Sequence, residues 1–198
     1  MTAMLLAQAQ AQPDAGLRHV AQYSARLSYV CMCLTLCWGV LTATGWVRNI
    51  TGRKALRGSH LALATLTLAF GGVHALCFLF LSTGALSLAY ITIPLFVPGA
   101  LARHELGIVG FELMLAIALT ASLYRFTSYR RWLWLHRLAY LAVGLTAVHS
   151  LLGAIANGHL AVDWLIGITL LVPTVTLSVL RFLPVRTLER IGLLEEQV

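Results

Sequence analysis

Residues 132–156 read WLWLHRLAYLAVGLTAVHSLLGAIA. This stretch contains one arginine, Arg137, and two histidines, His136 and His149, and its other side chains are uncharged. An α-helix needs about 20 predominantly apolar residues to cross the hydrocarbon core of a bilayer. The stretch therefore predicts a membrane-spanning helix that carries two imidazole side chains, and a polar ring inside a membrane indicates a function by default.

The rest of the chain has the same apolar character. Hydrophobic residues make up 59% of the sequence and charged residues only 11%, whereas a soluble domain carries about 25% charged residues. This composition excludes a soluble globular domain and a disordered chain. Four further stretches are long and apolar enough to span a bilayer, and they cover residues 27–47, 60–82, 106–124 and 164–180. We predict an all-α membrane protein with a bundle of five transmembrane helices. Residues 85–97 are apolar but short, and we expect an interfacial or partly re-entrant segment there and no sixth span.

Basic residues predict the orientation of the bundle. Eleven of them fall in residues 48–57, 125–137 and 181–190, which all lie on one side of the membrane. The other side has only Arg18, Arg26 and Arg103. Because basic residues concentrate in cytoplasmic loops, we expect the amino terminus outside and the carboxyl terminus in the cytoplasm. The clusters also account for the net charge of +7, so we expect no nucleic-acid partner.

This orientation divides the chain into three parts. We predict an extracytoplasmic segment over residues 1–26, a membrane domain over residues 27–183 and a cytoplasmic tail over residues 184–198. The protein is expected to be an integral multi-pass protein, surrounded by lipid, in a plasma membrane of the bacterial type.

Four histidines lie within two of the predicted spans. His60 and His74 are 14 residues apart in the second span, and His136 and His149 are 13 apart in the fourth. At 1.5 Å per residue, these separations correspond to about 21 Å and 20 Å along the helix axes. Because the two spans run in the same direction, we expect His60 and His136 at the cytoplasmic level, and His74 and His149 at the outer level.

Two histidines at one depth match the needs of a haem. A zinc site takes four ligands, and neither level has a matching cysteine or carboxylate. Haem iron needs only two axial ligands from the protein. The sequence therefore predicts two b-type haems between the second and fourth spans, with Arg57, Arg130 and Arg131 near the propionates of the inner haem. A separation of 13 residues would leave two side chains about 140° apart on a straight helix, so we expect either a local distortion of the helix or a different approach of the two side chains.

The chain resembles the ferric reductase-like transmembrane domain of ferric reductases, NADPH oxidases and the membrane haem subunit of the bacterial periplasmic methionine sulfoxide reductase system. The resemblance rests on the two histidine spacings and on Trp132-x-x-x-His136-Arg-Leu-x-Tyr140, and it covers roughly residues 27–182. It implies that His60 and His136 hold the iron of the inner haem, and His74 and His149 that of the outer haem. Family members commonly have six spans and often continue into a flavin and nicotinamide domain. No Gly-rich dinucleotide motif follows Leu183, so we expect a separate electron donor.

Transmembrane electron transfer is the predicted function. A cytoplasmic flavoprotein or quinol would supply the electrons, and a redox acceptor or protein partner outside would receive them. The chain would be an oxidoreductase component without catalytic residues of its own, with a flavin or quinone bound on the cytoplasmic side or by a partner. The alternatives are a quinone-linked cytochrome b anchor of a peripheral dehydrogenase and a structural or accessory subunit of a larger membrane complex. Four residues receive no assigned role: Glu112, His19, His104 and His159.

Overall fold

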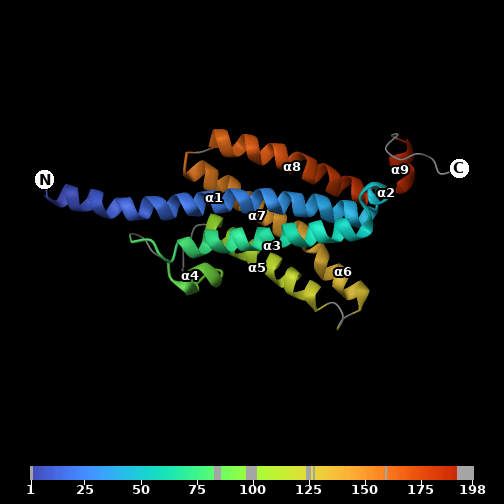
Figure 1. Ribbon diagram of the computed structural model, residues 1–198, viewed down its shortest axis with the longest axis horizontal. Coiled ribbons are helices and arrows are strands. Elements are labelled where there is room, and N and C mark those ends of the chain that lie inside the picture. Colours follow the sequence, from blue (N-terminus) through green and yellow to red (C-terminus); the bar gives the residue numbers. More distant parts are fainter. Residues whose placement is uncertain are drawn as a thin grey trace.

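The computed structural model describes residues 2–82, 86–96, 102–123, 126, 128–158 and 160–190. Over these residues the chain is helical and contains no strand (Figure 1). Its helices are α1 (Thr2–Thr44), α2 (Arg48–Thr51), α3 (Arg53–Cys77), α4 (Leu88–Thr92), α5 (Ala102–Ser122), α6 (Tyr129–Arg137), α7 (Ala139–Ala156), α8 (Leu160–Phe182) and α9 (Val185–Arg190). Arg125, His159 and residues 191–198 of the predicted tail lie outside the described residues.

Five stretches of helix are long and apolar enough to cross a membrane, which confirms the predicted number of spans. They are Asp14–Thr44, Arg53–Cys77, Ala102–Ser122, Tyr129–Ala156 and Leu165–Phe182. Successive spans run in opposite directions, so α3 and α7 are parallel (Figure 1). The chain is therefore an integral multi-pass membrane protein.

The first helix is longer than the predicted span of residues 27–47. α1 begins at Thr2, and its candidate span begins at Asp14. The alanine, leucine and glutamine residues before Asp14 are good helix formers, although they do not form a long apolar run. Asp14 is buried, and its carboxylate accepts hydrogen bonds from the backbone N–H and the hydroxyl of Ser82, at 2.8 and 2.7 Å. These bonds attach α1 to the segment that follows α3.

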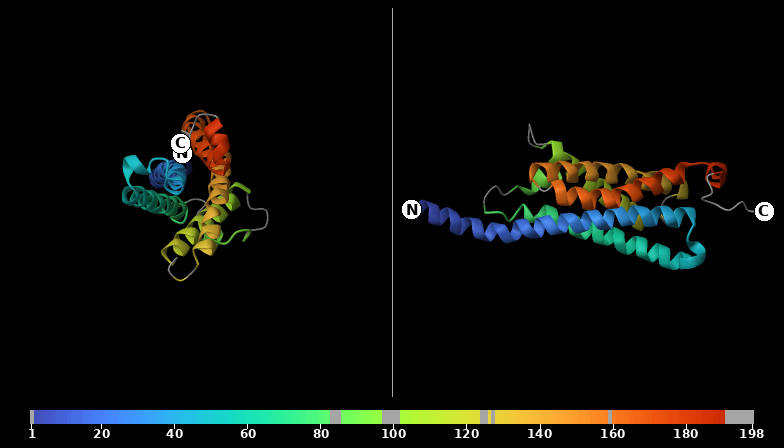
Figure 2. Two further views of the ribbon diagram at one scale, coloured as in Figure 1. Left: turned by 90° about the vertical axis from the view of Figure 1, so that its right-hand side faces the viewer. Right: turned by 90° about the horizontal axis from the view of Figure 1, so that it is seen from above.

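α1 lies in the middle of the bundle. It contacts α3, α7 and α8, while α5 packs along α7 (Figure 2). Met32 and Cys33 of α1 and Val143 of α7 form a buried cluster at this centre. Two glycines allow the other helices to approach closely, because an added Cβ would lie 2.9 Å from Phe111 at Gly71 and 2.6 Å from the Thr146 hydroxyl at Gly110. Small residues have this role at many membrane helix contacts.

Within the described part of the connection between α3 and α5, the short α4 is the only helix. Five residues are too few to cross a bilayer, in agreement with the expectation that residues 85–97 form no sixth span. The Ser87 hydroxyl caps α4 by accepting a hydrogen bond from the Tyr90 N–H at 3.2 Å. Leu95 has a positive φ of 58°, and its N–H donates to the Glu105 carboxylate at 2.6 Å. This bond anchors the connection to the first turn of α5.

The predicted fourth span is divided into two helices. α6 ends at Arg137, α7 begins at Ala139, and Leu138 lies between them in a turn. The Leu138 N–H donates to the Leu135 carbonyl at 3.0 Å, which is the tighter spacing of a 3₁₀ turn.

Candidate metal centre

The structure brings the four intramembrane histidines together in two pairs across the gap between α3 and α6–α7. The ring centroids of His60 and His136 are 6.0 Å apart, with an angle of 68° between the ring planes. Those of His74 and His149 are 6.2 Å apart, with an angle of 71°. These are the pairs that the sequence placed at common depths. Along α3 the two pairs are separated by about 21 Å.

The interruption at Leu138 lies between His136 and His149. On a straight helix, two side chains 13 residues apart point about 140° away from each other. Here the turn gives each histidine its own helix axis, with His136 on α6 and His149 on α7. Both rings reach partners on the same helix, α3.

The distance within each pair suits two ligands of one metal ion. Two imidazoles that bind a metal from opposite sides have ring centroids roughly 6 Å apart, because each metal–nitrogen bond is about 2.0–2.1 Å long. The described residues contain no group of three or more His, Cys, Asp or Glu side chains that could hold a metal. The pairs thus offer two ligands each, which matches a metal that brings its remaining ligands with it.

Hydrogen bonds orient three of the four rings. The Nδ1 atom of His60 lies 3.1 Å from the Thr35 carbonyl, that of His74 lies 2.9 Å from the Ala21 carbonyl, and that of His149 lies 2.5 Å from the Arg103 carbonyl. A carbonyl only accepts, so each Nδ1 donates its hydrogen and each Nε2 retains a free lone pair. Histidines that bind metals usually donate their second ring nitrogen in this way, which fixes the tautomer and the ring orientation.

Both histidines of α3 receive their acceptors from α1. Three contacts at intervals of seven residues join the two antiparallel helices, and they pair Ala21 with His74, Ser28 with Thr67, and Thr35 with His60. In the middle contact, the Ser28 hydroxyl donates to the Thr67 carbonyl at 2.9 Å. The register between α1 and α3 therefore determines the position of both rings.

His136 has a different environment. Its Nδ1 atom is buried and has no hydrogen-bond partner in the part of the chain that the structure describes. The ring instead stacks on Trp132, one turn earlier in α6, with centroids 5.0 Å apart and planes at 20°. Arg181, near the end of α8, lies close enough to His136 to act on it electrostatically. From the sequence, Trp132 is part of a motif and Arg181 is a topology signal, and neither role indicates the stacking on His136 or the electrostatic influence on it.

Two glycines leave room for the histidine rings. An added Cβ at Gly107 would lie 2.7 Å from both Cε1 and Nδ1 of His149, a distance at which one group must move. At Gly39 it would lie 3.2 Å from Cε1 of His60. The absence of a side chain at these two positions therefore allows each ring to reach its carbonyl acceptor.

The arginines proposed from the sequence lie at the same end of the bundle as His60 and His136. Arg57 is one turn before His60 on α3, and Arg130 and Arg131 are in the first turn of α6. All three side chains are exposed. They are accessible to an anionic group near this histidine pair.

Three residues to which the sequence assigned no role are His19, His104 and Glu112. His19 is exposed and stacks on Tyr23. Nδ1 of His104 lies 3.3 Å from the Tyr90 hydroxyl, and its ring interacts electrostatically with His149. Glu112 is exposed in the middle of α5.

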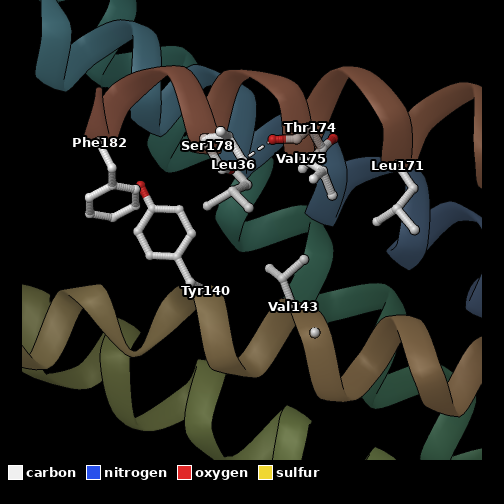
Figure 3. A pocket seen from close by; sticks show the side chains of 10 residues that line it. Leu36, Tyr140, Val143, Leu171, Thr174, Val175, Ser178 and Phe182 are labelled. Atoms are coloured by element: carbon white, nitrogen blue, oxygen red, sulfur yellow. Dashed lines mark hydrogen bonds between the residues drawn. The ribbon is translucent and has the colours of Figure 1, made fainter. Parts of the chain in front are cut away.

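A cavity of about 320 Å³ lies between α1, α7 and α8 (Figure 3). Tyr140 and Phe182 line one end of it, with ring centroids 5.5 Å apart. The hydroxyls of Thr174 and Ser178 donate to carbonyls of their own helix, at 2.6 and 2.7 Å. These two hydroxyls are already hydrogen-bonded, and the Tyr140 hydroxyl is the remaining polar side-chain group of the lining.

The family described as ferric reductase like transmembrane component matches residues 24–147, which is more than half of the chain. The chain belongs to this family. The matched region includes His60, His74 and His136 of the ferric reductase-like domain and ends two residues before His149. Domains of this family generally bind haem, and membership indicates electron transfer within the membrane. No curated protein and no solved structure matches the chain.

Proposed function

We propose that this chain holds two b-type haems, one between His60 and His136 and the other between His74 and His149, and conducts electrons across the membrane. The observation that carries the proposal is the pair of opposed imidazoles at each of two depths, with Nδ1 of three rings hydrogen-bonded to a carbonyl. When bound there, haem iron with two imidazole ligands supplies one-electron transfer without an open position for oxygen.

The residues around each pair have distinct roles in this proposal. The carbonyls of Ala21, Thr35 and Arg103 hold three imidazoles with Nε2 free to bind a metal. Arg57, Arg130 and Arg131 bind the propionates of the inner haem, because guanidinium groups form strong bonds with carboxylates. The apolar helices around the rings exclude water from the path.

The direction of transfer follows from the distribution of basic residues. With the amino terminus outside, His60 and His136 lie near the cytoplasm and His74 and His149 near the outer face. A cytoplasmic flavoprotein or quinol gives up the electrons, and an acceptor outside receives them. The alternatives are a quinone-linked anchor of a peripheral dehydrogenase and an accessory subunit of a larger complex.

A reduced-minus-oxidised spectrum of the purified chain, expressed with an adequate haem supply, tests the proposal. We expect two b-type haems per chain and the low-spin electron paramagnetic resonance signals of iron with two imidazole ligands. Protein that is folded and contains no haem would exclude the proposed function.

Arg181 provides a prediction about the inner site. Replacing it by glutamine removes a positive charge near His136, so the reduced haem there loses a stabilising interaction. We expect the midpoint potential of the inner haem to fall, by roughly tens of millivolts for a partly buried charge. Potentiometric titration in the His74→Ala background, where only the inner haem is expected, measures this shift directly. Arg18→Gln, an exposed cation at the other end of the bundle, should leave the potential unchanged.

A further inference from the structure

The inner and outer histidine pairs differ in how the second ring nitrogen is held. In the outer pair, Nδ1 of His74 and Nδ1 of His149 both donate to main-chain carbonyls, at 2.9 and 2.5 Å. In the inner pair, Nδ1 of His60 donates in the same way, at 3.1 Å. Nδ1 of His136 is buried and has no hydrogen-bond partner among the residues that the structure describes. The outer pair therefore has two of these hydrogen bonds and the inner pair has one.

This difference affects how strongly each pair binds an oxidised metal. An imidazole whose Nδ1–H donates to a carbonyl has more electron density on its ring, so its Nε2 is a more basic ligand. A more basic ligand stabilises the oxidised metal, which carries the higher positive charge. Because His136 lacks the hydrogen bond, the inner pair favours the oxidised state less than the outer pair does. Hydrogen bonds of this kind are among the features with which a protein sets a reduction potential.

The charges near the two pairs act in the same direction. Arg181 acts electrostatically on His136, and a nearby cation stabilises the reduced metal because that state carries one positive charge less. Within the described part of the chain, the groups that act electrostatically on His74 are two other histidines. At that end of the bundle, Arg103 acts on His104. The missing hydrogen bond and the charge of Arg181 thus both raise the reduction potential at the inner pair.

Trp132 orients the His136 ring by stacking. The two residues are four apart on α6, so their side chains lie on the same face, and their ring centroids are 5.0 Å apart. Indole has an N–H donor and no acceptor, so it cannot accept a hydrogen bond from the Nδ1–H of His136. Position 132 is therefore a place where an acceptor can be added without changing any of the four histidines.

We propose that the protein makes its two metal sites unequal, and that His136 and Arg181 stabilise the reduced metal at the inner pair relative to the outer pair. This inequality rests on the proposed function, because it concerns the haems that the two pairs hold there. It makes the inner pair the position where an electron rests in this chain. We expect the equilibrium constant for reduction to be about tenfold larger at the inner pair, which corresponds to about 59 mV for a one-electron couple.

Two variants with one haem each provide the comparison. His74→Ala is expected to keep the inner haem and His60→Ala the outer one, so that each lacks the influence of the neighbouring site. Spectroelectrochemical titration of the purified chains should give the higher midpoint potential for His74→Ala. In the wild type, the paramagnetic resonance signal that disappears first during reduction should be the signal that His74→Ala retains. Equal potentials, or a higher potential at the outer pair, would overturn the inequality and leave the haem content and the proposed function intact.

Position 132 tests the role of the hydrogen bond. In the His74→Ala background, Trp132→Gln places an amide oxygen one turn before His136, where it can accept from the Nδ1–H. We expect the midpoint potential of the inner haem to fall towards that of the outer haem. Trp132→Phe retains an aromatic ring without an acceptor and is the matched control, with an unchanged potential. Haem quantitation verifies that each variant is loaded. A potential that falls equally in both variants, or in neither, would show that the missing hydrogen bond does not cause the difference.

Discussion

Replacing His74 by alanine should reduce the haem content of the purified chain from two per chain to about one and should stop electrons from crossing the membrane. His74 faces His149 at a ring distance of 6.2 Å, and its Nδ1 is held by the Ala21 carbonyl. Without His74, the outer site offers only one protein ligand, His149, to the iron. Pyridine haemochrome quantitation and flash-initiated reduction in vesicles measure the two effects.

His19→Ala is the matched control for that experiment. His19 lies on α1 at the same end of the bundle as His74, but it is exposed and stacks on Tyr23. We expect this variant to retain both haems. If His74→Ala kept two haems with unchanged spectra, the assignment of the outer pair would be wrong.

Gly107→Ala should also release the outer haem, although every histidine is still present. The new Cβ would lie 2.7 Å from Cε1 and Nδ1 of His149, and the neighbouring backbone of α5 carries the Arg103 carbonyl that this ring uses. The imidazole has to move away from its acceptor and from His74. We expect haem content to fall to about one per chain, and the paramagnetic resonance signal of the outer site to disappear with it.

Gly16→Ala separates this effect from the general consequences of replacing a glycine in a helix. Nothing lies within 4 Å of a Cβ added at Gly16, and alanine favours the helix at both positions. The control variant should have two haems and at least wild-type thermal stability. Equal haem contents in the two variants would show that the contact between Gly107 and His149 is not needed.

The main features of the fold follow from patterns that a sequence shows directly. Long apolar runs predict spans because backbone groups inside a bilayer must be hydrogen-bonded within one helix. Histidine spacing on two parallel spans predicts a common depth, because the rise per residue is constant. The long α1 was not predictable in this way. Residues 2–12 favour a helix but form no long apolar run, and they belong to the predicted extracytoplasmic segment.

The hydrogen bonds and close contacts of the candidate site could not be predicted from the sequence. The acceptors of the His60, His74 and His149 hydrogen bonds are main-chain carbonyls, which every residue has, so no residue type reveals them. Gly107 and Gly39 are two of 16 glycines, and only the helix packing distinguishes them from the rest. The electrostatic influence of Arg181 on His136 depends on where α8 lies relative to α6. The spacing of His136 and His149 predicted either a local distortion of the fourth span or a different approach of the two side chains, and it gave no indication of the turn at Leu138.

The three contacts at seven-residue intervals between α1 and α3 determine which sequence changes the protein tolerates during evolution. Ala21 and Thr35 contribute main-chain oxygens to the histidines, so most substitutions at these positions preserve the acceptors. A single inserted or deleted residue between them would turn one end of α1 by about 100° relative to the other and detach His60 or His74. Related chains should therefore vary freely in the side chains at these two positions while keeping the number of residues that separates them.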